Sequence, residues 1–162
     1  MKYKHGKIFK KASPKIVELA AFDYVPSTDE YYTFVRKQRE AGYRQVIITS
    51  EMMIKLMKKY FLERKFRIAS VEFMIEDGAL ENQVHDILKK LNGDRGYFNL
   101  LIDELTFLVE ETSIDIKKVE FKRREDNHSL SLHIQVNGIF GVNEADFDDE
   151  SEVLIRAIEG CM

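Results

Sequence analysis

Residues 116–142 read IKKVEFKRREDNHSLSLHIQVNGIFGV. Apolar and polar residues alternate cleanly over 129–136, which is typical of a β-strand with one buried face. The Asn137-Gly138 pair that follows is the strongest short hairpin signal, so a returning strand is expected over 139–142. An earlier strand is expected over 116–124. Together these residues predict an antiparallel three-stranded meander.

A turn at 125–128 sets the register between the first two strands of this meander. Apolar residues then face each other, with Phe121 opposite Leu132 and Val119 opposite Ile134, and this agreement supports the register. The outer face of the two strands then carries Lys118, Glu120, Lys122, Ser131, His133 and Gln135.

The candidate catalytic residues lie on that outer face and are Glu120, Lys122 and His133. A glutamate beside a histidine and a lysine can perform general acid–base catalysis. The residues from Glu120 to Lys122 also match the Glu-x-Lys pattern of metal-dependent nucleases, in which carboxylates hold Mg²⁺ and a lysine orients the attacking water. The alternative interpretation is a solvated sheet face with cross-strand charge pairs.

Upstream of the meander, strands and helices alternate along the chain. Strands are expected over 15–25, 43–49 and 66–75, and helices between Ser27 and Gly42 and from Ser50 to Arg64. For 15–25 a helix that begins at Ser13 and Pro14 remains an alternative. Strand–helix–strand spacing of this kind is typical of βαβ units with parallel strands.

Further helices are expected over 80–91, 95–112 and 148–159. The one over 95–112 is apolar almost all round, so it is expected to be the most buried element or a contact surface. The predicted fold class is α+β: a short parallel βαβ part, a helical pair, the antiparallel three-stranded meander and a C-terminal helix. Residues 1–13 are expected to form a basic N-terminal tail and residues 14–162 a single α+β domain.

The composition excludes several classes of protein. The chain has 162 residues, 33% charged and 44% hydrophobic, as in ordinary globular domains. Its one cysteine, Cys161, cannot form an internal disulfide, and no metal site or cofactor is expected. Apolar runs are shorter than the ~20 residues that span a bilayer, so we expect no membrane contact and a cytoplasmic location. Abundant Lys and Ile with two prolines suit an AT-rich bacterial genome.

Charge is unevenly distributed along the chain, although the net charge is −3. Residues 1–67 contain 16 of the 25 basic residues and 7 of the 28 acidic ones. Such asymmetry indicates an anionic partner or head-to-tail self-association. The candidate nucleic-acid-binding residues are Lys2, Lys4, Lys7, Lys10, Lys11, Lys55, Lys58, Lys59, Arg64, Lys65 and Arg67. Tyr3 and Phe9 lie between the lysines and are available for base stacking.

The sequence lacks a specific catalytic motif, so an enzyme is not favoured. The predicted function is a non-enzymatic cytoplasmic interaction or regulatory protein, which self-associates as a homo-oligomer or binds a protein partner. The first alternative is a nucleic-acid-associated protein that uses the basic N-terminal half. The second is a metal-dependent nuclease or other hydrolase with its site on the meander face. A contiguous basic surface would favour the nucleic-acid alternative.

Overall fold

The computed structural model describes residues 2–12 and 17–162. The strands are β1 (Tyr3–Lys11), β2 (Leu19–Asp23), β3 (Tyr43–Gln45), β4 (Arg67–Phe73), β5 (Ile116–Glu125), β6 (His128–Gln135) and β7 (Ile139–Asn143). The helices are α1 (Tyr31–Glu40), α2 (Ser50–Lys58), α3 (Gly78–Gly93), α4 (Phe98–Glu111) and α5 (Phe147–Glu159). The π-helical turn η1 (Lys59–Glu63) continues α2, and the 3₁₀ turns η2 (Arg95–Tyr97) and η3 (Glu144–Asp146) precede α4 and α5.

These strands form one sheet in the order β2-β1-β7-β6-β5-β4, with β3 also paired to β1. Every strand pair within the described residues is antiparallel. The α+β class is therefore confirmed, and the expected parallel βαβ part is wrong. The strands expected to be parallel neighbours do not meet, because β3 pairs with β1 whereas β4 pairs with β5 at the far edge of the sheet.

Strand β1 accounts for this difference. Residues 1–13 are expected to be a basic tail, but Tyr3–Lys11 is a strand inside the sheet. It pairs with β2 along one edge, and with β7 and then β3 along the other. Ile8 and Phe9 are fully buried. The lysines of β1 interrupt its apolar pattern, and for that reason the sequence resembles a solvated tail.

Two other strands predicted in the N-terminal half are shorter in the structure than expected. Of the strand and helix interpretations of 15–25, the strand is confirmed over Leu19–Asp23, and the helix start at Ser13 and Pro14 lies outside the described residues. The strand expected over 43–49 ends at Gln45. The chain then crosses to the β6–β7 connection, where the Ile48 amide donates to the Val136 carbonyl at 2.8 Å.

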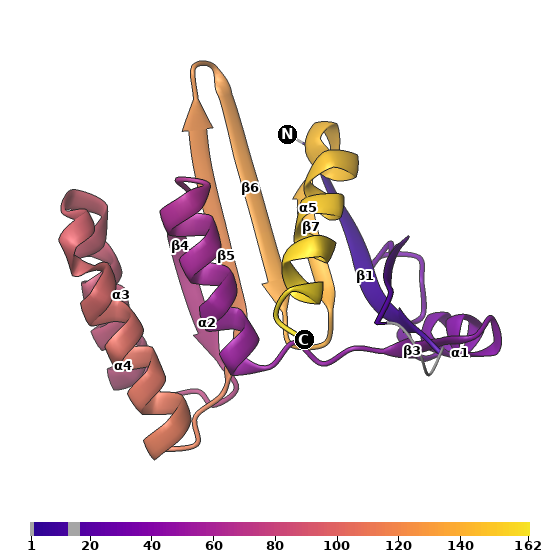
Figure 1. The fold of residues 1–162 in the computed structure, drawn as a ribbon, viewed down its shortest axis with the longest axis horizontal. Coiled ribbons are helices and arrows are strands. Elements are labelled where there is room, and N and C mark those ends of the chain that lie inside the picture. The colour runs from indigo at the N-terminus through magenta and orange to yellow at the C-terminus, as the bar shows by residue number, and fades with distance from the viewer. Residues whose placement is uncertain (1, 13–16) are drawn as a thin grey trace.

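The meander is confirmed with its register. Phe121 pairs with Leu132, Glu120 with His133, and Lys122 with Ser131. After Asn137 the chain turns through Gly138, whose φ of +82° lies in the left-handed region that favours glycine. Strand β7 then returns beside β6. In Figure 1 the β5–β6 hairpin extends beyond the ends of the neighbouring strands.

The main core lies on one face of the sheet. Figure 1 shows α2 and α5 over this face, with α3 and α4 beside α2. Leu105, Phe121 and Leu154 are fully buried between these layers. Helix α4 is not the most buried element: it leaves Leu100 and Phe107 exposed, whereas all residues of β7 are buried. No helix among the described residues combines the length and apolar character needed to cross a membrane.

Helix α1 lies on the opposite face of the sheet and covers one corner of it. Phe9 alternates with the core residue Ile8, so its ring points to this second face, where it lies 5.9 Å from the ring of Phe34. The rings of Phe34 and Tyr24 are 5.1 Å apart. Helix α1 itself buries no residue fully. The α1 contact is thus a partly exposed aromatic layer.

The rest of the second face is polar, and we call it the open face. Lys122, Arg124 and Ser129 are exposed there, in contrast to the buried residues that alternate with them along β5 and β6. By strand register, the residues on the open face are Tyr3, His5, Arg67, Ser70, Glu72, Lys118, Glu120, Lys122, Arg124, Ser129, Ser131, His133, Gln135, Gly141 and Asn143.

Candidate functional site

The strand register aligns a row of polar residues across the open face. Arg67 pairs with Lys122, and Lys122 pairs with Ser131. Next, the Ser131 amide donates to Asn143 Oδ1 at 2.7 Å, and Asn143 pairs with Tyr3. The row therefore runs over β4, β5, β6, β7 and β1. With about 4.8 Å between neighbouring strands, its length is about 19 Å.

The open face has a groove of about 710 Å³ along this row. We call it the basic groove. Its lining residues are Tyr3, Lys65, Arg67, Lys122, Arg123, Arg124, Ser129, Leu130 and Ser131. Five of these nine residues are Lys or Arg, and none is acidic.

The β5–β6 hairpin extends beyond the ends of the neighbouring strands (Figure 1), and residues of this hairpin line the groove. Strand β7 pairs with β6 over Leu132–Ile134. Beyond that point the side chain of Asn143 takes over, because its Nδ2 also donates to the Ser129 carbonyl at 3.0 Å. On the side away from β5, the first part of β6 is thus held by the buried amide side chain of Asn143, and Ser129 and Ser131 of β6 line the groove.

The cations of the basic groove differ in how strongly they are already engaged. Lys122 lies 3.7 Å from the carboxylate of Glu120. Arg123 donates to the Arg64 carbonyl at 2.9 Å and packs over the ring of Phe66. By contrast, no ion pair is found within the described chain for the three other cations, Lys65, Arg67 and Arg124. These three charges are available to an anionic ligand.

Lys65 has an unusual backbone conformation that places it at the groove. Its φ is +61°, in the left-handed region that commonly ends a helix. It lies two residues after the end of η1, and the chain reverses there so that the Phe66 amide donates to the Tyr60 carbonyl at 2.9 Å. This turn starts β4 at Arg67, so Lys65 and Arg67 enter the groove from the same short segment.

Three aromatic side chains pack together next to the groove. The ring of His133 lies 5.6 Å from that of Tyr3, nearly parallel to it, and 5.5 Å from that of His5. Tyr3 Oη lies 3.1 Å from His133 Nδ1 and donates to the Gly141 carbonyl at 3.0 Å. Gly141 makes this packing possible, because a Cβ there would lie 2.5 Å from the rings of both His133 and Tyr3.

Burial keeps this aromatic cluster uncharged. It lowers the pKa of His133 to about 3, with a further lowering by the charge of Lys118. The pKa of His5 is lowered for the same two reasons. Burial also raises the pKa of the Tyr3 phenol to about 12. All three rings are therefore neutral near pH 7.

The candidate catalytic residues do come together, but their environment does not favour acid–base chemistry. Glu120 lies opposite His133 and forms an ion pair with Lys122. His133 is 5% exposed, and a base with a pKa of about 3 takes up a proton poorly at neutral pH. In the described part of the chain, no group of three or more His, Cys, Asp or Glu residues is arranged to hold a metal ion.

The N-terminal lysines do not form one surface. Lys4 lies 3.3 Å from Asp23 and over the ring of Phe147, which places it on the helix-covered side of the sheet. Lys11 lies 4.0 Å from Glu18. Lys2 is exposed, and Lys10 is partly buried beside β3. The candidate set of lysines is therefore divided between the two faces and the edge of the sheet.

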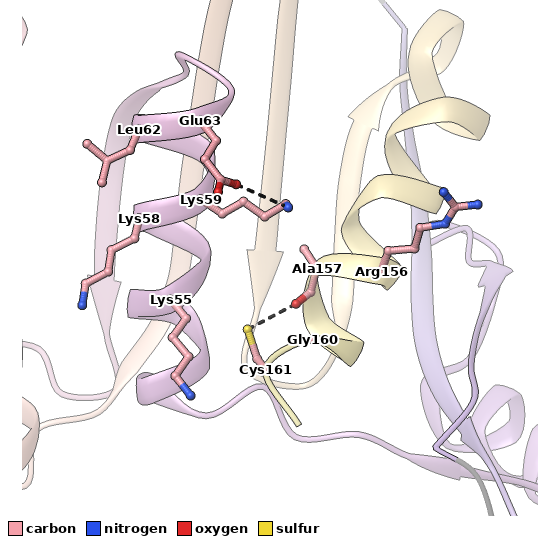
Figure 2. A pocket seen from close by; sticks show the side chains of 9 residues that line it. All are labelled: Lys55, Lys58, Lys59, Leu62, Glu63, Arg156, Ala157, Gly160 and Cys161. Carbon is pink, nitrogen blue, oxygen red and sulfur yellow. Dashed lines mark hydrogen bonds and ion pairs between the residues drawn. The ribbon is translucent and has the colours of Figure 1, made fainter.

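Lys55, Lys58 and Lys59 lie elsewhere, along a cleft of about 420 Å³ between α2 and α5. Figure 2 shows Lys58 and Arg156 extending away from each other rather than converging on the cleft. Lys55 and Lys59 have acidic partners one helical turn away. Cys161 also lines the cleft, but burial raises the pKa of its thiol. This cleft therefore presents dispersed, largely neutralised charge.

Lys7 is fully buried beneath α1, unlike the other lysines of β1. Its Nζ donates to the Asn137 carbonyl and lies 5.4 Å from the ring of Phe9 and 5.3 Å from that of Tyr31. Burial lowers the pKa of this ammonium group to about 8. Lys7 is therefore unavailable to a ligand and instead links β1 to the β6–β7 turn.

We expect Lys7 to make folding stability rise with pH in the alkaline range. Its pKa is about 8 in the folded chain and close to 10.5 when unfolded. Between these values the unfolded chain binds more protons, so the destabilising effect of burying this ammonium group decreases as pH rises. Urea denaturation at about pH 7 and about pH 9.5 should show a smaller rise for Lys7→Met than for the wild type. Equal pH dependence in both proteins would contradict this assignment.

Comparison of the chain with protein-family models, with curated proteins and with solved structures found no match.

Part of the basic groove was predicted from the sequence. Tyr3, Lys65 and Arg67 belong to the candidate nucleic-acid-binding set, and the structure brings all three together. Arg124 and Ser129 were missed as binding residues. The hairpin register contained the signal, because Arg124 pairs with Ser129 and lies on the same face as Lys122.

Proposed function

We propose that the protein is a non-enzymatic binding protein that takes a nucleic acid in the basic groove. The observation that carries this proposal is the convergence of Lys65, Arg67 and Arg124, three cations without acidic partners in the described chain. Nucleic-acid backbones present regularly spaced phosphates, and neutralising them with Lys and Arg supplies most of the affinity that does not depend on sequence.

The form of the groove supports the same ligand. The planar guanidinium groups of Arg67 and Arg124 match the geometry of phosphate oxygens better than a lysine does. The hydroxyl-bearing residues Ser129 and Ser131 line the groove beside these cations. Sugar and phosphate oxygens are common hydrogen-bond partners of such side chains in protein–nucleic acid complexes.

The net charge of the protein affects how binding depends on salt concentration. The net charge of −3 opposes long-range attraction of a polyanion. Binding therefore depends on short-range contacts within the groove. These contacts release counterions, so affinity falls as salt rises, with a log–log slope of about 0.7 per contacted phosphate for a single strand.

The experiment is a charge reversal within the groove. We expect Arg67→Glu with Arg124→Glu to weaken binding of a fluorescein-labelled RNA of about 12 nucleotides at least tenfold, and to reduce the salt dependence. Fluorescence anisotropy at several salt concentrations measures both effects. The matched control is Lys58→Glu with Lys89→Glu, which makes the same change in net charge at exposed sites outside the groove. An equal loss in the control, or no binding by the wild type, would rule out the proposal.

Self-association remains a second candidate. Leu100 and Phe107 are two turns apart on α4 and are 46% and 53% exposed. Exposed apolar side chains on one helix are typical of contact surfaces when they form a contiguous patch. Sedimentation velocity of the pure protein over a range of concentrations tests this prediction, and a monomer throughout the range would contradict it.

A further inference from the structure

We infer that the basic groove takes a single strand rather than a duplex, with one base stacked on the ring of Tyr3. This inference rests on the proposed function and specifies the form of its ligand. Tyr3 lines the groove at the end of the polar row opposite to Arg67.

The ring of Tyr3 is held as a rigid surface. Its hydroxyl is engaged with His133 Nδ1 and with the Gly141 carbonyl, and its ring lies nearly parallel to that of His133. Tyr3 is nevertheless 37% exposed. Since both interactions hold the hydroxyl against the sheet, the exposed part of the residue is mainly the aromatic ring. Such a fixed ring loses little freedom when a base stacks on it.

The support behind Tyr3 is also aromatic and uncharged. His133 is 5% exposed and is neutral at physiological pH, because burial lowers its pKa. His5 packs against both rings, at 5.4 Å from Tyr3 and 5.5 Å from His133. Gly141 leaves the space that these rings fill. The cluster thus resembles the aromatic platforms on which unpaired bases stack.

The cations lie where the backbone of a stacked strand would pass. Lys122 and Arg67 follow Ser131 along the row, away from Tyr3, and Arg124 lies one pleat further along β5. Sheet surfaces that combine aromatic rings with basic side chains bind single strands, because unpaired bases expose their faces. In a duplex each base face is covered by its neighbours, so Tyr3 could not reach one without unstacking. The groove therefore favours a single strand over a duplex, because only the single strand offers an exposed base face to Tyr3.

An acidic peptide is the competing ligand, since it would satisfy the same cations. It offers no base to the Tyr3 ring, so its binding would depend on Arg67 and Arg124 but not on Tyr3. The two ligands are therefore distinguished by the response of binding to a Tyr3 substitution.

The experiment compares three fluorescein-labelled probes by anisotropy: oligo(U) of about 12 nucleotides, its duplex with oligo(A), and an oligo-glutamate peptide of similar length. The proteins are the wild type, Tyr3→Leu, Tyr3→Phe and, as a control, Tyr32→Leu. Tyr32 is 74% exposed on α1 and does not line the groove. Tyr3→Phe keeps the ring and loses only its hydroxyl. Thermal melting shows whether each variant is folded.

We expect the wild type to bind oligo(U) more tightly than the duplex. Tyr3→Leu should weaken oligo(U) binding about 10- to 100-fold, the usual effect of removing one stacking partner, and leave the weak duplex binding unchanged. Tyr3→Phe should keep most of the affinity, and Tyr32→Leu all of it.

The outcomes separate this inference from the proposed function. Equal binding of duplex and single strand, with no effect of Tyr3→Leu but a loss on reversing Arg67 and Arg124, would overturn the inference and leave nucleic-acid binding intact. Binding of oligo-glutamate alone would overturn both. If Tyr3→Phe lost as much affinity as Tyr3→Leu, the hydroxyl rather than the ring would matter, which would also overturn stacking.

Discussion

Replacing Glu150 with glutamine is expected to lower the free energy of unfolding by about 3–5 kcal/mol. Glu150 on α5 forms a two-point ion pair with Arg64, whose Nη2 donates to Oε2 at 2.8 Å. The glutamate side chain is 6% exposed and the arginine side chain 20%. Glutamine would leave the guanidinium without its counter-charge in a site with little water, and this explains the large cost.

A matched control lies two residues further along the same helix. Glu152 forms an ion pair with Arg156 on the same helix, but these side chains are 62% and 76% exposed. Glu152→Gln should therefore change stability by no more than about 0.5 kcal/mol. Urea denaturation of both variants gives the comparison. Similar small losses would show that Arg64 is solvated well enough to dispense with its partner.

The Arg64–Glu150 pair also bears on the basic groove. The Arg64 carbonyl accepts a hydrogen bond from Arg123, and Lys65 follows directly in the chain. The pair therefore anchors to α5 the segment that leads into β4. Because the double variant Arg64→Met with Glu150→Met removes both charges together, it should be more stable than Glu150→Gln.

The second large effect is expected at Leu105, where substitution by alanine should cost about 2–5 kcal/mol. Leu105 is fully buried at the centre of α4 and belongs to the main core. Truncation removes apolar contacts and leaves a cavity that the surrounding helices close only in part. Chemical denaturation measures the loss.

Leu100→Ala provides the comparison on the same helix. Leu100 is 46% exposed, so the same truncation should stay within about 0.5 kcal/mol of the wild type. If Leu105→Ala were equally mild, α4 would contribute little to the core. A large loss for Leu100→Ala would instead indicate that a second copy covers this face.

Local sequence patterns predicted several individual strands and the register between them. The alternation of apolar residues with Asn137-Gly138 placed β6 and β7, and cross-strand matching of Phe121 with Leu132 gave the correct register. Such features depend on side chains close in sequence, so they can be read from short segments. The predicted start of α1 was less accurate, because the residue that caps this helix is Glu30 and not Ser27.

The candidate site was predictable in composition but not in assembly. The basic segment around Lys65 and Arg67, together with Tyr3, was singled out as nucleic-acid-binding. The hairpin register placed Lys122 on the outer face. What joins these groups is the position of β1 beside β7, which brings Tyr3 into line with β4–β6. Tyr3 and His133 are separated by 130 residues and yet lie in contact.

Residues close together in the chain were enough to predict the α+β class and the meander with its register. Contacts between distant segments make β1 a strand of the sheet, with antiparallel neighbours. The reason is that a strand's hydrogen bonds are made to other segments, so its own residues need not show an apolar pattern. In β1 the lysines gain partners that no local pattern reveals: Lys4 packs over Phe147, and Lys7 reaches the Asn137 carbonyl beneath α1.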